Sequence, residues 1–134
     1  MKNLTNLLYY IAMIGLLFWF AYSKGWILAN FETITPQQAK ILLENDENVT
    51  LLDVRTPEEF RTGHLRGATL IPLEKLESNL DKLSPFKNKK IIVYCRSGNR
   101  SVSASRILEK NGFTPLNVKN GIIGLMGAKI ELTQ

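Results

Sequence analysis

The sequence IIVYCRSGNR at residues 91–100 joins an apolar run to a polar loop, and the fold of the chain can be predicted outward from it. The run at 91–94 is short, rich in β-branched residues and uncharged, which is typical of a buried strand. After the loop, residues 101–111 carry apolar side chains at helical spacing, and Gly112 is a stop signal for a helix. The loop therefore connects the end of a buried strand to the start of a helix.

The chain's single cysteine, Cys95, is the first residue of this loop. Where a helix begins, free backbone N–H groups and the helix dipole favour an anion. Gly98 allows the backbone to curl so that successive N–H groups point inward, and Arg96 and Arg100 add positive charge. These features favour the thiolate form of Cys95, which is the reactive form. The alternative is a small buried hydrophobe beside solvated arginines, which does not account for the order of these residues.

The segment 95–100 resembles the active-site loop of the rhodanese family of sulfurtransferases. In that family the loop cysteine accepts a sulfane sulfur and carries it as a persulfide. Related phosphatases and arsenate reductases of the same fold have a loop that is one residue longer, which forms a cradle for a tetrahedral phosphate. Here four residues separate Cys95 from Arg100, and the smaller ring suits a terminal sulfur atom. The loop length thus favours sulfur transfer over phosphate chemistry.

A second patch that resembles the rhodaneses lies at residues 53–68. It contains the tripeptide DVR at 53–55, a predicted helix that carries the sequence EEF at 58–60, and the glycine-containing turn GHLRGA at 63–68. Only Leu65 departs from the family pattern, which has isoleucine at that position.

Three residues of this patch are candidates for supporting the active loop: Asp53, Arg55 and His64. Asp53 lies at the carboxyl end of an apolar strand, where open α/β sheets place their sites. Structural pairing of Asp53 with Arg55 or with loop N–H groups is favoured, and a catalytic use of Asp53 or His64 is the alternative.

The resemblance covers residues 31–127 and weakens toward the C-terminus. The segment NGIIGL at 120–125 is similar to the family's Gly-Gly-Ile-x-x-Trp segment, but Asn120 replaces the first glycine and Leu125 replaces the tryptophan. The usual glycine-proline ending is missing as well. We therefore expect the packing beside the active loop, and the access of substrate to it, to differ from the family pattern.

Alternating strands and helices predict an α/β domain with helices on both faces of a parallel sheet. The rhodanese resemblance implies a sheet of about five strands. The expected strands are residues 31–34, 49–54, 68–71, 91–94 and 114–118, and the expected helices include 36–45, 72–83 and 101–111.

Residues 1–28 differ in composition from the rest of the chain. Residues 7–22 carry no charge, and the apolar run at 4–22 is close to the roughly 20 residues that a membrane-spanning helix needs. A cleavable secretory signal is the alternative, with Ala21-Tyr22-Ser23 as a small-x-small cleavage site. The bulky FWF at 18–20 favours an uncleaved anchor. We expect a transmembrane anchor and short linker over 1–28 and a rhodanese-like domain over 29–134.

The net charge excludes some functions and leaves the membrane orientation open. The formal net charge is +5, but the basic residues are scattered, which argues against nucleic-acid binding. Lys2 and Lys24 flank the apolar run so evenly that the positive-inside rule has little asymmetry to act on. The short basic segment before the apolar run, which contains Lys2, is expected to stay in the cytoplasm. This favours a periplasmic or otherwise extracytoplasmic domain.

Together these features predict a thiosulfate sulfurtransferase-like enzyme at a membrane. Cys95 is expected to take sulfane sulfur from thiosulfate, a persulfide or a polysulfide and to pass it to a thiol or cyanide. This chemistry requires neither a metal nor an organic cofactor, and the sequence has no cysteine or histidine cluster with metal-ligand spacing. The expected substrate-binding residues are Arg96, Ser97, Gly98, Asn99 and Arg100.

Several alternatives stay open at this point. Arg100 could instead brace the loop by pairing with a carboxylate. The domain could be a non-catalytic docking module, or a relay that passes sulfur to a partner protein at the membrane. A cysteine-dependent phosphatase or arsenate reductase is disfavoured by the loop length.

Overall fold

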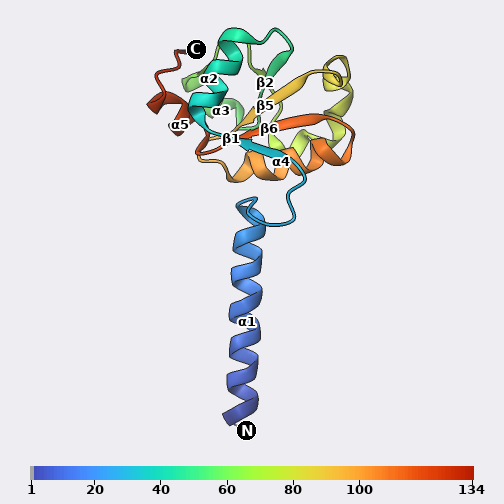
Figure 1. Ribbon diagram of the computed structural model, residues 1–134, viewed down its shortest axis with the longest axis vertical. Helices are drawn as coiled ribbons and strands as arrows, with labels where there is room; N and C mark the ends of the chain where they lie inside the picture. The colour runs from blue at the N-terminus through green and yellow to red at the C-terminus, as the bar shows by residue number, and fades with distance from the viewer. Residues whose placement is uncertain (1) are drawn as a thin grey trace.

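The computed structural model describes residues 2–134, which form a long N-terminal helix and an α/β domain (Figure 1). Met1, the first residue of the expected anchor, lies outside the described residues. The helix α1, Lys2–Ser23, stands away from the domain and none of its residues is buried. Within residues 2–134 it is the one helix that is long and apolar enough to cross a membrane, and a signal sequence would share these properties.

The domain is built on a parallel sheet, as the sequence predicts. Within the described chain, five strands pair in the order β1-β6-β5-β2-β4, all parallel. The order places β5 at the centre of the sheet, and its residues Ile91, Ile92 and Val93 have no exposed surface. The strands are β1 Glu32–Ile34, β2 Val49–Asp53, β4 Thr69–Leu70, β5 Lys90–Tyr94 and β6 Thr114–Val118.

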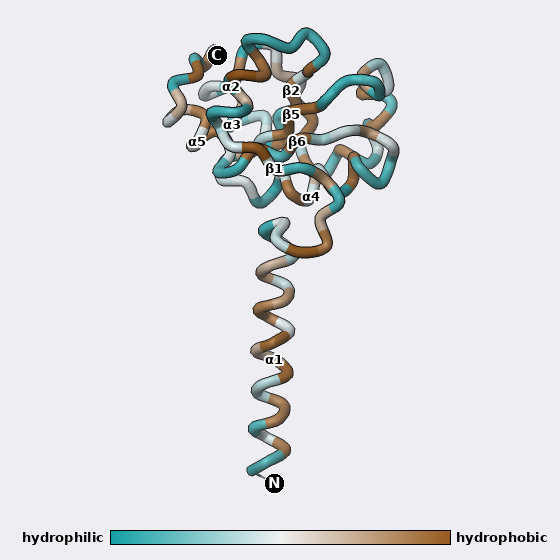
Figure 2. The backbone as a smooth tube through the Cα atoms, viewed as in Figure 1, coloured by the Kyte–Doolittle hydropathy of each residue, from teal (hydrophilic) through white to brown (hydrophobic). Residues whose placement is uncertain are grey.

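Helical segments cover both faces of the sheet and divide the core in two. On one face, Ile91 and Val93 pack with Leu108 of α4, Asn99–Lys110. On the other face, Ile92 and Tyr94 pack against α2, Pro36–Asn45, and α5, Gly121–Gly127. Successive side chains of a strand point to opposite faces, so the uninterrupted apolar run of β5 supplies both halves of the core. Hydrophobic residues accordingly concentrate in the strands and recur along α1 (Figure 2).

Local capping determines where two of the helices begin. The Thr35 side chain accepts a hydrogen bond from the Gln38 N–H group at 3.1 Å, and Pro36 follows as the first helical residue of α2. Thr56 and Pro57 repeat this arrangement at the start of α3, Pro57–Thr62. Each is a capping box, which satisfies N–H groups that otherwise lack partners in the first turn.

The structure differs from the single helix that the sequence predicts over residues 72–83. Two 3₁₀ segments take its place, η1 Leu73–Lys75 and η2 Glu77–Phe86, and the backbone at Asn79 is non-helical with φ of −125°. The Asn79 amide donates to the Lys75 carbonyl at 2.7 Å, which is the local competition that disfavours asparagine inside helices. The apolar face is nevertheless as expected, because its leucines pack into the core.

A small antiparallel pair lies outside the main sheet and was not expected from the sequence. Strands β3, His64–Leu65, and β7, Leu132–Thr133, bring the end of the chain beside the glycine-containing turn. Two-residue strands carry too little pattern to be recognised from sequence alone.

Candidate active site

Cys95 follows the central strand β5 directly, and its side chain is buried at 1% exposure. Its Sγ atom accepts the N–H group of Gly98 at 3.1 Å and lies 3.5 Å from the Ser101 hydroxyl oxygen. Gly98 has φ of 106°, a left-handed conformation that glycine adopts without strain, and it caps the start of α4. The loop thus curls around the sulfur and presents the Gly98 N–H group to it as a hydrogen-bond donor.

The start of α5 holds this loop from the other side. The N–H group of Ile122 donates to the Cys95 carbonyl at 2.7 Å, and that of Ile123 donates to the Arg96 carbonyl at 3.3 Å. Gly121, with φ of 54°, allows this approach, because a Cβ atom there would lie 2.5 Å from the Arg96 carbonyl oxygen and would also overlap that of Cys95. Only glycine fits at this position.

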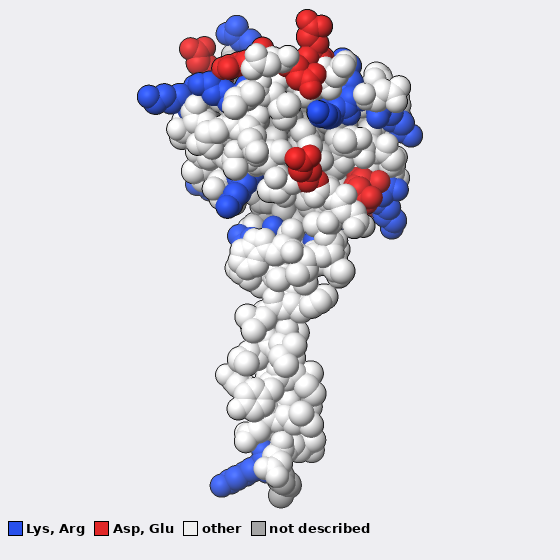
Figure 3. All heavy atoms as spheres, viewed as in Figure 1, with Lys and Arg blue, Asp and Glu red and all other residues white. Residues whose placement is uncertain are grey.

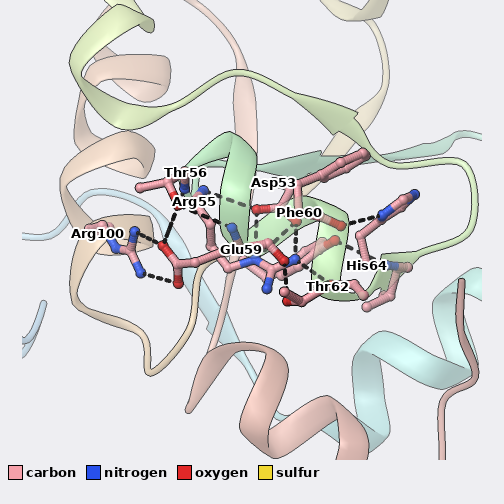
Figure 4. Close-up of polar contacts among 11 residues, drawn as sticks. Asp53, Arg55, Thr56, Glu59, Phe60, Thr62, His64 and Arg100 are labelled. Carbon is pink, nitrogen blue, oxygen red and sulfur yellow. Dashed lines mark hydrogen bonds and ion pairs between the residues drawn. The ribbon is translucent and has the colours of Figure 1, made fainter. Parts of the chain in front are cut away.

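An ion pair braces the other end of the loop. The guanidinium of Arg100 contacts the carboxylate of Glu59 through two hydrogen bonds of 2.7 and 2.9 Å (Figure 4). The hydrogen bond from Arg100 lowers the pKa of Glu59 to about 2. Glu59 also closes the capping box of α3, because its carboxylate accepts the Thr56 N–H group at 3.2 Å. The brace therefore connects the loop to the start of a capped helix.

Asp53 and Arg55 form a buried ion pair with a separation of 2.7 Å and exposures of 0% and 4%. The Asp53 carboxylate also accepts the Arg55 backbone N–H group at 3.0 Å, and the Arg55 guanidinium donates to the Gly63 carbonyl at 2.8 Å. These contacts connect the end of β2 to the turn before β3. The pairing that the sequence favours for Asp53 is therefore present in the structure.

His64 lies apart from Arg100, at the opposite side of the polar cluster in Figure 4. Its Nδ1 atom is 2.8 Å from the Phe60 carbonyl oxygen, so this nitrogen carries a proton and donates. The imidazole ring is stacked on the Phe60 ring with 3.5 Å between centroids. These contacts hold His64 against α3.

Arg96 is the exposed arginine of the loop, and within residues 2–134 no hydrogen bond or ion pair engages its guanidinium. It lines a pocket of about 510 Å³ together with apolar side chains of α5. Two of these, Ile123 and Met126, are more than half exposed, whereas Leu125 is fully buried in the core. A free guanidinium beside an open pocket is suited to bind an anion.

The sequence did not identify Glu59, Ser101 or Gly121 as parts of the site. Glu59 carries a local signal, since it stands three residues after Thr56 in a capping-box pattern, but this pattern indicates a helix start rather than a partner for Arg100. Across residues 2–134, no group of three His, Cys, Asp or Glu side chains could hold a metal ion.

Replacing Gly121 with alanine should destabilise the folded protein. The new Cβ atom overlaps the carbonyls of Cys95 and Arg96. We expect a loss of at least about 2 kcal/mol in the free energy of unfolding, measured by urea denaturation of the full chain in detergent. Gly127→Ala is the matched control, because nothing lies within 4 Å of its Cβ position. Equal stabilities of the two variants would contradict the packing described here.

The Glu59–Arg100 pair should make stability depend on pH in the acid range. Because the pKa of Glu59 is lowered from 4.5 to about 2 on folding, the carboxylate stabilises the folded state fully above pH 4.5, and this contribution is lost as the pH falls toward 2. Wild type should exceed Glu59→Gln by about 1 kcal/mol in unfolding free energy at neutral pH. Urea denaturation at several pH values should show this difference shrinking in acid. A difference that does not change with pH, or one that the exposed neighbour variant Glu58→Gln reproduces, would contradict the pairing.

Comparison with known proteins agrees with this geometry. The family model of the rhodanese-like domain matches residues 35–126. The thiosulfate sulfurtransferase PspE of Escherichia coli is 32% identical over 80 residues, which cover 60% of this chain and 77% of PspE. YrkF of Bacillus subtilis is 36% identical over 90 residues, which cover 66% of this chain and 48% of YrkF. The chain thus spans about half the length of YrkF and about three quarters of PspE.

Solved structures show the same fold. A rhodanese-like domain protein from Staphylococcus aureus superposes with a TM-score of 0.66 at 33% identity, covering 71% of this chain and 91% of that one. The thiosulfate sulfurtransferase of Pseudomonas aeruginosa, at 22% identity, shares the fold with a TM-score of 0.72, over 85% of this chain and 23% of its own. Because the family model matches more than half of its length, the chain belongs to the rhodanese-like domain family.

Proposed function

We propose that this protein is a membrane-anchored sulfurtransferase that carries sulfane sulfur as a persulfide on Cys95. Family membership and the similarity to the thiosulfate sulfurtransferase PspE support a sulfur-transfer role. The observation that carries the assignment to Cys95 is the 3.1 Å contact between its sulfur and the Gly98 N–H group, in a loop with four residues between Cys95 and Arg100.

In the first step the Cys95 thiolate attacks the outer sulfur of the donor. With thiosulfate, a new S–S bond forms to Cys95, the bond between the two sulfurs of thiosulfate breaks, and sulfite leaves with the electron pair of that bond. A persulfide or polysulfide donor reacts in the same way and releases a thiol or a shorter polysulfide. The product is an anionic persulfide whose terminal sulfur faces the loop amides, as in covalent catalysis with preorganised donors.

Arg96 is the residue best placed to bind the anionic end of the donor. Its guanidinium is unpaired within the described chain and borders the pocket of about 510 Å³. Ser97, Gly98 and Asn99 complete the binding loop, and Arg100 contributes positive charge while its pairing with Glu59 keeps the loop in shape. Asp53, Arg55 and His64 support the site through the structural contacts described above.

In the second step an acceptor removes the sulfur. A thiolate attacks the terminal sulfur of the persulfide, takes it as a new persulfide, and returns Cys95 to the thiolate. Cyanide does the same and leaves as thiocyanate. The exposed Ile123 and Met126 at the edge of the pocket also suit a thiol carried by a protein, so a sulfur relay at the membrane uses the same chemistry.

The chain is further proposed to comprise an anchor with its linker over residues 1–28 and the rhodanese-like domain over 29–134. Support comes from α1, whose apolar side chains are exposed along its length instead of contributing to the core. Trp26 is 69% exposed just after the helix, as interfacial aromatic residues are. The short basic start supports an extracytoplasmic side for the domain.

Thiosulfate should add one sulfur atom to the protein. We expect the intact mass to rise by roughly 32 Da, and the increase to be removed by cyanide or a reducing thiol, because catalysis through a thiolate passes through a covalent intermediate. Cys95→Ser should show neither the adduct nor turnover, and Ser103→Ala, at an exposed position of α4 outside the loop, serves as the matched control. If wild type gains no sulfur, the domain is a docking module; if Cys95→Ser turns over normally, the mechanism is wrong.

The N-terminal segment should remain attached and hold the protein in a membrane. A run of this length spans about 30 Å of hydrocarbon, so carbonate extraction should leave the full-length protein in the membrane pellet. The intact mass of the pelleted protein should include residues 1–22. A soluble product that begins near Lys24 would instead identify the segment as a signal peptide.

A further inference from the structure

A second pocket, of about 360 Å³, lies between the linker that follows α1 and the Cys95 loop. It shares no lining residue with the pocket beside Arg96. The linker contributes Lys24 and Trp26, and the loop contributes residues 97–99. Lys119 supplies a second ammonium group, and among the described lining residues none is acidic. The pocket is therefore positively charged and adjacent to the active loop, with polar groups set in a partly apolar lining.

Asn117 of β6 lines this pocket and has an unsatisfied amide. Its side chain is 97% buried, since only 3% of the residue is exposed, and its Oδ1 atom has no hydrogen-bond partner in the described structure. The Nδ2 atom makes a long contact of 3.4 Å with the Thr33 hydroxyl. An asparagine amide can present either its oxygen or its NH₂ group, so its free end can pair with a hydroxyl or with an anionic oxygen. Buried polar groups normally have partners, which points to a ligand.

The linker wall of the pocket is fastened to the domain. The guanidinium of Arg106, in α4, donates to the carbonyls of Tyr22 at 2.6 Å and Ile27 at 3.0 Å, and it lies 3.7 Å from the centre of the Tyr22 ring. The Lys24 ammonium donates to the Asn99 side-chain oxygen at 2.9 Å. These contacts connect the end of α1 and the linker to the helix that starts at the active loop, so the domain holds this wall of the pocket in place.

The pocket also has a defined position relative to α1. That helix ends at Ser23, and the pocket begins with the next residue, Lys24. Figure 3 shows blue atoms and no red ones in this view where the helix meets the domain. If α1 is the anchor proposed above, on which this step rests, the pocket lies at the level of the lipid headgroups, where lysines attract anionic lipids.

From these observations we infer that the pocket binds the phosphate-bearing headgroup of an anionic membrane lipid. Lys24 and Lys119 pair with the phosphate, and the free end of the Asn117 amide hydrogen-bonds to a phosphate or glycerol oxygen. The contact between Lys24 and Asn99 places the bound headgroup beside the Cys95 loop. Free inorganic phosphate offers the same oxygens, but it lacks the acyl chains that concentrate a lipid at the end of α1.

The test is native mass spectrometry of the full chain from detergent micelles with equal amounts of phosphatidylglycerol and phosphatidylcholine. Wild type should retain one phosphatidylglycerol in preference to phosphatidylcholine. Lys119→Ala should weaken this retention about fivefold, the effect expected for one lysine at a membrane surface. Lys82→Ala removes the same charge from an exposed position outside the pocket and should retain the lipid as wild type does.

Three results would overturn the inference: equal retention of the two lipids, equal effects of the two lysine variants, or displacement of the lipid by millimolar inorganic phosphate. The last result would assign the pocket to free phosphate. Treating the same sample with thiosulfate distinguishes failure of the lipid site from failure of the proposed sulfur transfer. If Cys95 gains a sulfur atom but the protein shows no preference for phosphatidylglycerol, only the lipid site is rejected. An intact mass that begins near Lys24 would instead reject the anchor on which the lipid site depends.

Discussion

The hydrogen bond from the Ile122 N–H group to the Cys95 carbonyl, 2.7 Å long, is the contact on which the active loop depends. Together with the bond from Ile123 to Arg96, it directs two successive carbonyls toward α5. The Gly98 N–H group is then left to face the sulfur at 3.1 Å. Gly121 is the constraint behind this arrangement, since any side chain there would separate α5 from the loop. The short segment after β6 thus determines the shape of a loop that precedes it by more than twenty residues.

Two ion pairs near the loop differ in how much they contribute to the stability of the folded protein. The Asp53–Arg55 pair is buried, so removal of one partner would leave an uncompensated charge in the core, a loss of about 3–5 kcal/mol. The Glu59–Arg100 pair is about one third exposed, and pairs of this kind contribute roughly 1 kcal/mol or less. The first pair therefore maintains the fold around the turn at residues 63–68, whereas the second adjusts the position of the loop. This difference separates residues that build the domain from those that shape the site.

The sequence predicts the parts of the structure that depend on local pattern. The apolar β5 run, the polar loop and α4 follow from periodicity, and α2 begins where Thr35 and Pro36 predict. The parts it does not predict depend on contacts between distant residues. Glu59 and Arg100 are 41 positions apart, and Arg106 and Tyr22 are 84 apart. Pairs of residues this far apart leave no periodic signal in the sequence. Neither the Glu59–Arg100 ion pair nor the contact between Arg106 and Tyr22 can therefore be recognised before the fold is known. Over residues 72–83 the leucine spacing indicates the buried face, but it does not distinguish one α-helix from two 3₁₀ segments with a non-helical residue at Asn79.

We propose that a loop of this length, closed around Cys95, selects sulfur transfer over phosphate chemistry. The decisive experiment inserts one glycine between Gly98 and Asn99 and measures sulfite release from thiosulfate. The insertion moves the Gly98 N–H group and Arg100 relative to the sulfur, so we expect the rate to fall on the order of 100-fold. A glycine inserted between Asn88 and Lys89, in an exposed turn before β5, should leave the rate close to that of wild type. Sulfite release at the wild-type rate from the enlarged loop, or hydrolysis of a phosphate ester by the unmodified protein, would contradict this role of the loop length.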